Sequence, residues 1–148
     1  MLREGIKEHF GALFYWVNFY RLYNCMIIHA PISIGELVDK ITILELKLEF
    51  LTDSKKLDNV NIELTHLNKI LNDLTIPDIV FERDALKFVN RRLWHIENFK
   101  RECEKNQTFG EEFVETARQV YLKNDLRAEI KRRINTIVGS TIVEEKSY

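Results

Sequence analysis

Residues 31–51, PISIGELVDKITILELKLEFL, decide the fold of this chain. After the opening proline, Ser33 and Glu36 stand at the spacing of a capping box, in which the serine hydroxyl accepts the backbone N–H three residues on. Beyond this cap, apolar residues recur at helical spacing along two stripes that lie roughly opposite each other. The first stripe contains Ile34, Leu37, Val38, Ile41, Leu44 and Leu48, and the second contains Ile43, Leu46 and Phe50. Because a helix that is apolar on two sides has neighbours on two sides, residues 31–51 are predicted to be the central helix of the domain.

Acidic residues interrupt both stripes of this helix. Glu45 projects among the first stripe, whereas Glu36 and Asp39 lie on the side of Ile43 and Phe50. A buried charge is tolerated only when it is paired and hydrogen-bonded. The central helix therefore carries acids where apolar side chains would be expected, and these acids need basic or polar partners on other helices.

Length, composition and charge indicate one globular domain. The 148 residues are enough to bury a core, and 45% hydrophobic with 30% charged residues is ordinary for a soluble protein. A formal net charge of −1 argues against broad, non-specific nucleic-acid binding. Cys25 and Cys103 match no metal or redox spacing, which indicates free thiols in a reducing compartment, so we expect a cytoplasmic protein.

Three more segments show apolar residues at helical spacing: residues 58–74, 79–105 and 108–138. Pro77 separates the first of these from the second, since proline disfavours helix at the residue before it. Five glycines and two prolines in the chain leave little room for a turn-rich β architecture. We therefore predict an all-α, single-domain bundle of about four core helices over residues 26–148.

Local signals mark several helix ends. The central helix should end at Asp53, where a polar connection begins. Thr108 and Glu111 form a second capping-box candidate at the start of the last helix. Gly139 is well placed to end that helix in a left-handed conformation.

Residues 1–25, MLREGIKEHFGALFYWVNFYRLYNC, differ from the rest of the chain because they are crowded with aromatic residues. We expect residues 10–23 to form an aromatic helix that packs on the bundle, on a second copy in a homodimer or on another protein. Asn18 and Arg21 break an apolar run that is shorter than the roughly 20 residues of a membrane span, so we predict no transmembrane segment. An interfacial membrane anchor is a second interpretation. A third is that Met26 is the natural start and residues 1–25 are an upstream extension.

Polar side chains also lie on the inward stripes of the third and fourth predicted helices. With the acids of the central helix, the candidates are Glu36, Asp39, Glu45, Asn90, Glu97, Arg101, Asn124, Asp125, Arg127 and Lys131. One interpretation is a buried salt-bridge network that fixes the register of the helices. The other is a ligand pocket between helices, which is a common location for binding sites in bundles.

The chemistry of these side chains suits a charged, polar ligand. Arg101, Arg127 and Lys131 could hold phosphate or carboxylate, and arginine can do so with two hydrogen bonds. The acids could instead gather a magnesium ion, which prefers oxygen ligands. The metal ligands in that case would be Glu36, Asp39 and Glu97.

Four sequence blocks carry a resemblance to a known family. They are MIIHAPISIGELVDKITILELK, VNRRLWHIENFKRE, FGEEFVETARQVYLKNDLRAEIKRRIN and GSTIVEEKSY, and together they span about residues 26–148. This part of the chain resembles a bacterial, all-helical domain family of unknown function whose members begin near a methionine that matches Met26. The resemblance implies that residues 1–25 are an extension. It also suggests a supporting role beside tetratricopeptide-type or glycan-related proteins.

The chain has a fainter likeness to the all-α nucleotide pyrophosphohydrolases of the MazG kind, which bind magnesium through two acid pairs. Glu36 and Asp39 match one pair at three-residue spacing. The second pair is missing, because Lys100 stands three residues after Glu97 and Asn98 follows it directly. The chain therefore carries only one of the two acid pairs with which these enzymes bind magnesium.

Three functional hypotheses follow. The preferred one is a cytoplasmic binding or accessory domain whose charged cleft between helices takes a polar or anionic ligand. The second is a magnesium-dependent hydrolase of nucleotides or similar phosphoesters. The third is a structural bundle that binds a protein partner through residues 10–23.

Overall fold

The computed structural model of the chain describes residues 27–145, and this part contains four α-helices and no β-strand. The helices are α2 (Ile34–Phe50), α3 (Ser54–Asn72), α4 (Val80–Asn106) and α5 (Glu111–Val138). All four belong to one compact unit that begins at Ile32. The predicted all-α bundle of four core helices is thus confirmed. The aromatic helix predicted within residues 1–25 lies outside the described residues.

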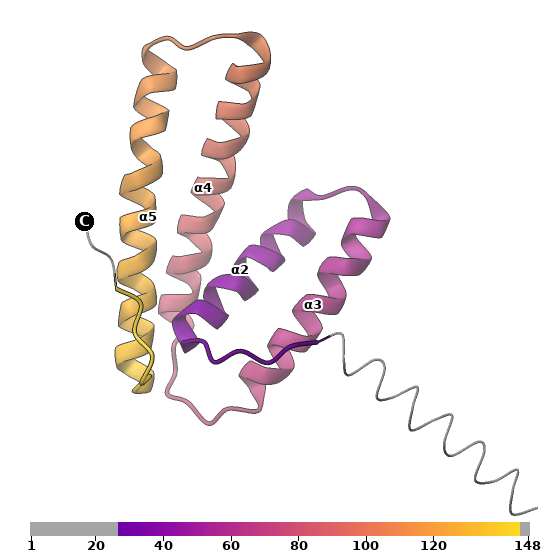
Figure 1. Cartoon of the computed structure of the whole chain (residues 1–148), viewed down its shortest axis with the longest axis vertical. Coiled ribbons are helices and arrows are strands. Elements are labelled where there is room, and N and C mark those ends of the chain that lie inside the picture. The colour runs from indigo at the N-terminus through magenta and orange to yellow at the C-terminus, as the bar shows by residue number, and fades with distance from the viewer. Residues whose placement is uncertain (1–26, 146–148) are drawn as a thin grey trace, which may run out of the picture. The chain divides into compact units, whose positions relative to one another are not determined.

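The helices form two antiparallel hairpins, α2 with α3 and α4 with α5 (Figure 1). α2 packs against each of the other three helices, whereas α3 contacts α2 alone among the described helices. The fully buried apolar side chains of α2 come from both apolar stripes: Val38, Ile41 and Leu44 from the first and Leu46 from the second. α2 is therefore the central helix, as its two-sided apolar pattern predicted.

The main core lies between α2 and the α4–α5 hairpin. Its buried members are Val38, Ile79, Leu86, Val89, Leu93, Ile130 and Ile134. Each such side chain contributes about 1.5–3 kcal/mol relative to an exposed one, so these residues hold the two hairpins together. The core ends well before the loop that joins α4 to α5, because α4 and α5 continue past the end of α2 (Figure 1).

Two helix ends agree with the local sequence signals, whereas α2 ends at Phe50 and not at the predicted Asp53. Ser33 caps α2, and its hydroxyl accepts the Glu36 backbone N–H at 3.2 Å. Gly139 follows α5 with a φ of 66°, the left-handed conformation expected there. α3 begins earlier than the predicted residue 58, because the Asp53 carboxylate accepts the Lys56 N–H at 3.1 Å and caps a helix from Ser54.

The predicted capping box of Thr108 and Glu111 is wrong. α5 begins after Gly110, and its first turn has no side-chain cap hydrogen bond. Thr108 serves the preceding helix instead, because its backbone N–H donates to the Cys103 carbonyl at 2.9 Å and closes the end of α4 beside the left-handed Gln107.

No helix in residues 27–145 is long and apolar enough to cross a membrane.

Candidate functional site

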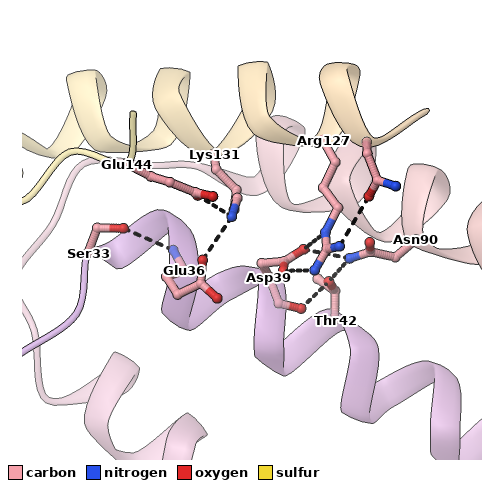
Figure 2. A network of polar contacts seen from close by, with 9 residues as sticks. Ser33, Glu36, Asp39, Thr42, Asn90, Arg127, Lys131 and Glu144 are labelled. Atoms are coloured by element: carbon pink, nitrogen blue, oxygen red, sulfur yellow. Dashed lines mark hydrogen bonds and ion pairs between the residues drawn. The ribbon is translucent and has the colours of Figure 1, made fainter. Parts of the chain in front are cut away.

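The centre of the polar network is the carboxylate of Asp39, which α2 holds against α4 and α5 (Figure 2). Asp39 is 1% exposed. Arg127 on α5 donates to both carboxylate oxygens, from Nε to Oδ1 at 2.8 Å and from Nη2 to Oδ2. Asn90 on α4 donates from Nδ2 to Oδ1, also at 2.8 Å. The buried acid is thus paired and hydrogen-bonded from two neighbouring helices.

Thr42 completes the buried part of this network. Its hydroxyl donates to the Asp39 backbone carbonyl at 2.8 Å and accepts from Asn90 Nδ2 at 2.9 Å. In the part of the chain that the structure describes, every buried side-chain nitrogen and oxygen has a hydrogen-bond partner. Because its members are satisfied, the network restrains the register of α2, α4 and α5 without leaving a buried polar atom unpaired.

A second ion pair lies one helical turn away, on the same side of α2. Lys131 on α5 is 9% exposed, and its Nζ donates to Glu36 Oε2 at 2.8 Å. The same ammonium group pairs with Glu144, which lies in the segment after α5 (Figure 2). Burial alone would lower the pKa of Lys131, but the hydrogen bonds to Glu144 and Glu36, together with the negative charges of these two acids, outweigh burial and raise its pKa.

Arg127 is held in its charged form in a similar way. The hydrogen bond to Asp39 raises the pKa of the guanidinium, and burial opposes that rise only in part. Both bases of the site are therefore charged at neutral pH and directed toward acids on α2.

The acids of α2 reach the bases of α5 because the two helices approach each other closely at Gly35. The Gly35 backbone N–H donates to Asn135 Oδ1 at 2.7 Å, in a buried contact. A Cβ atom added at Gly35 would lie 2.6 Å from the Lys131 carbonyl oxygen and 2.9 Å from Asn135 Oδ1. Only glycine permits this approach, which places the first turns of α2 alongside the last turns of α5.

A pocket of about 430 Å³ opens beside the ion pairs. It is lined by Glu36, Val120, Tyr121, Asn124, Asp125, Arg127, Ala128, Lys131 and Glu144. The wall thus combines α2, α5 and the segment that follows α5. Its acids and bases stand beside an aromatic ring and two small or aliphatic side chains, a mixture that suits a small polar ligand.

The structure brings most of the sequence-predicted site residues to this place. Those in the network or the pocket wall are Glu36, Asp39, Asn90, Asn124, Asp125, Arg127 and Lys131. Glu45 lies on α2 but faces a different group of bases. Its carboxylate pairs with Arg83 and with Lys87, the latter at 3.0 Å, in a ladder between α2 and α4.

The expected inward position of Arg101 is wrong, because Arg101 is exposed. Glu97 is half-buried and accepts a hydrogen bond from its neighbour Lys100 at 3.2 Å. The reason is the length of α2. Its last residue, Phe50, stacks on Trp94 with ring centroids 5.4 Å apart, so the turns of α4 that follow Trp94 lie beyond α2.

The residues proposed to hold magnesium do not fit that ion. Glu97 is engaged with Lys100, whereas Asp39 is engaged with Arg127 and Glu36 with Lys131. Within residues 27–145, no group of three or more His, Cys, Asp or Glu side chains is arranged to hold a metal ion.

Sequence reasoning missed Gly35, Thr42 and Glu144 as parts of the site. A glycine inside an otherwise apolar helix signals close approach of another backbone. Thr42 stands three residues after Asp39, which places both on one face of the helix. Glu144 gave no signal, because the conformation of a short segment after a helix is not encoded in any periodic pattern.

Comparison with known families confirms the resemblance that the four sequence blocks carried. The model of a family of unknown function (DUF6165) matches residues 28–148, a range that includes all four described helices. The chain belongs to this family. No curated protein and no solved structure matches the chain. Because the family has no assigned function, any functional conclusion has to come from the geometry of the site.

Proposed function

We propose that the helical unit is a non-catalytic binding domain that takes a small, polar molecule in the pocket between α2 and α5. The observation that carries the proposal is the pocket of about 430 Å³ whose wall includes Arg127 and Lys131. Its volume is typical of small-molecule sites, which occupy about 300–1,000 Å³. Sites between the helices of a bundle are built in this way, from side chains on facing helices.

The arrangement of the wall supports specific recognition. Asp39 orients Arg127 through two hydrogen bonds, and Asn90, which also donates to the Thr42 hydroxyl, orients the Asp39 carboxylate in turn. A preorganised guanidinium costs little further conformational entropy when a ligand binds. Tyr121 and Val120 add apolar surface on the same side of α5.

Binding is favoured over metal-dependent hydrolysis because the carboxylates are paired with bases. Glu36 is held by Lys131, Asp39 by Arg127 and Glu97 by Lys100. A magnesium ion would have to displace these bases and draw together side chains from distant turns. We therefore assign no step of hydrolysis to the pocket.

The test is a ligand screen of the full chain by two-dimensional NMR, with a pocket-filling variant as the comparison. Ala128 lines the pocket, whereas its neighbour Glu129 is exposed and lies outside it. A compound that binds in the pocket should shift the backbone amides of Tyr121 and Lys131 in the wild type and in Glu129→Trp. The same compound should leave Ala128→Trp unchanged. A screen in which no compound shifts these amides would refute the proposed function.

A further inference from the structure

The segment after α5 folds back along the helix it leaves. Gly139 reverses the chain with its φ of 66°, and the Ser140 N–H donates to the Asn135 carbonyl at 2.8 Å. The Ser140 hydroxyl then donates to the Ile142 carbonyl at 2.9 Å. The segment runs beside the last turns of α5 (Figure 1), which brings Glu144 to the ammonium group of Lys131 (Figure 2). We call residues 140–145 the tail.

The ion pairs between α2 and α5 already balance in charge without Glu144. On the helices, Asp39 pairs with Arg127 and Glu36 pairs with Lys131, so two acids meet two bases. Glu144 adds a third acid to the same bases. Glu36 on α2 therefore gives the Lys131 ammonium group an ionic partner that does not depend on the tail, and the tail places one additional carboxylate in the pocket wall.

The tail is held by few contacts of other kinds. Its residues 141–145 are all exposed, including Ile142 at 41% and Val143 at 48%. The other ion pair of the tail, Glu145 with Arg132, spans 3.8 Å between side chains that are 80% and 54% exposed, so solvent screens it. A segment that buries so little apolar surface opens at low free-energy cost.

From these observations, and resting on the proposed function, we infer that Glu144 is an internal stand-in for the ligand. The ligand of the pocket is a small molecule with a carboxylate or phosphate group, which takes the place of the Glu144 carboxylate on Lys131 and displaces the tail. The ligand's anionic group would occupy the position beside Lys131 that the Glu144 carboxylate takes in the structure. The neighbouring Arg127 guanidinium and the Tyr121 ring would then contact the rest of the molecule.

Competition with the tail lowers the apparent affinity in a calculable way. When the binding-competent state is only a fraction of the population, the apparent dissociation constant rises by the inverse of that fraction. Removing the Glu144 charge should therefore tighten anion binding, whereas most losses of a charged group from a binding site weaken it. This sign distinguishes a stand-in from a group that contacts the ligand.

The experiment is an NMR titration of the full chain with inorganic phosphate and, separately, with succinate, at constant ionic strength set by potassium chloride. Three proteins are compared: the wild type, Glu144→Gln and the matched control Glu145→Gln. Both substitutions remove one carboxylate from the exposed tail, so neither threatens the folded core. The amides of Tyr121 and Lys131 report on the pocket, and the amides of Ile142 and Val143 report on the tail.

We expect phosphate or succinate to shift pocket and tail amides with one midpoint in the wild type. Glu144→Gln should bind the same anion about three- to tenfold more tightly, as for a tail that closes the pocket for most of the time. Glu145→Gln should stay within about twofold of the wild type, because its ion pair is exposed. The anion with the lower dissociation constant identifies the ligand's group as phosphate or carboxylate.

Three results would overturn the inference. They are equal affinity in Glu144→Gln and Glu145→Gln, pocket shifts without tail shifts in the wild type, and no pocket shift by either anion in Glu144→Gln. These results overturn the inference about Glu144 and not the proposed function, which a different result tests. If a neutral or cationic compound binds the wild type and not Ala128→Trp, the pocket is a binding site but the tail is no stand-in for its ligand.

Discussion

Arg127 on α5 donates hydrogen bonds to both oxygens of the Asp39 carboxylate on α2, although the two residues are 88 positions apart in the sequence. The two partners are buried unequally, since the side chain of Asp39 is 2% exposed and that of Arg127 is 27% exposed. Arg127 therefore reaches from the pocket wall to an acid that water does not reach. The same guanidinium joins the structural core to the surface where we place the ligand.

Removing Arg127 should destabilise the fold more than removing any exposed base. Arg127→Met leaves the buried Asp39 carboxylate without its ionic partner, and we expect a loss of about 3 kcal/mol in the free energy of unfolding. Arg101→Met is the matched control, because Arg101 is exposed on α4, and it should change that free energy by less than about 0.5 kcal/mol. Urea denaturation of the three proteins measures both. Equal losses in the two variants would contradict the central role of the Asp39–Arg127 pair.

Gly35 should tolerate no larger residue. Gly35→Ala places a methyl group 2.6 Å from the Lys131 carbonyl oxygen, so α2 and α5 must separate and the Gly35–Asn135 hydrogen bond must lengthen. We expect a loss of about 2–3 kcal/mol in the free energy of unfolding, even though alanine is the better helix former. Gly110→Ala is the control. A Cβ there meets no atom within 4 Å, and the loss should be at most about 1 kcal/mol. If Gly35→Ala were neutral or stabilising, the close approach of α2 and α5 would be refuted.

The ladder between α2 and α4 should contribute modestly to stability. The Glu45 carboxylate, which is 20% exposed, pairs with Arg83 and Lys87. Glu45→Gln should lower the free energy of unfolding by about 1 kcal/mol, since hydrogen bonds to the amide remain available. Glu63→Gln removes a partner of Lys40 from a pair that is 42% and 52% exposed, and its effect should be below about 0.5 kcal/mol. The prediction fails if thermal and urea unfolding show no difference between these variants.

Lys131 should make the fold sensitive to alkaline pH. Its folded pKa lies above the ordinary value of 10.5, so its ion pairs contribute fully below that pH. The contribution is lost as the pH rises through the folded pKa, because the unfolded chain releases the proton more easily. Unfolding free energies measured between pH 9 and about pH 11.5 should therefore fall more steeply for the wild type than for Lys131→Met.

The control for this pH dependence is Lys69→Met. Lys69 is 77% exposed and pairs with Asp73 at 3.4 Å within one helix. This variant should follow the wild-type curve. Parallel curves for Lys131→Met and the wild type would mean that the folded environment does not hold the Lys131 proton.

The sequence predicted the side of each helix on which a residue lies better than it predicted which residues meet. Asn90 and Glu97 share one stripe of α4, yet Asn90 reaches Asp39 while Glu97 pairs with Lys100. The helical period specifies an angle around the axis and says nothing of how far along the axis a neighbouring helix extends. Because α2 ends beside Trp94, one half of the stripe is covered by α2 and the other half is not.

Within the described residues, the sequence alone determined the helical class of the domain, the central position of α2 and the helix ends at Ser33 and Gly139. These properties depend on interactions between residues three or four positions apart, which a linear pattern records. The tertiary structure decided which acid meets which base, the contact between Gly35 and Asn135 and the position of Glu144 on Lys131. Those contacts join residues that are distant in sequence, so they depend on the packing of whole helices and on a chain reversal that no periodic pattern encodes.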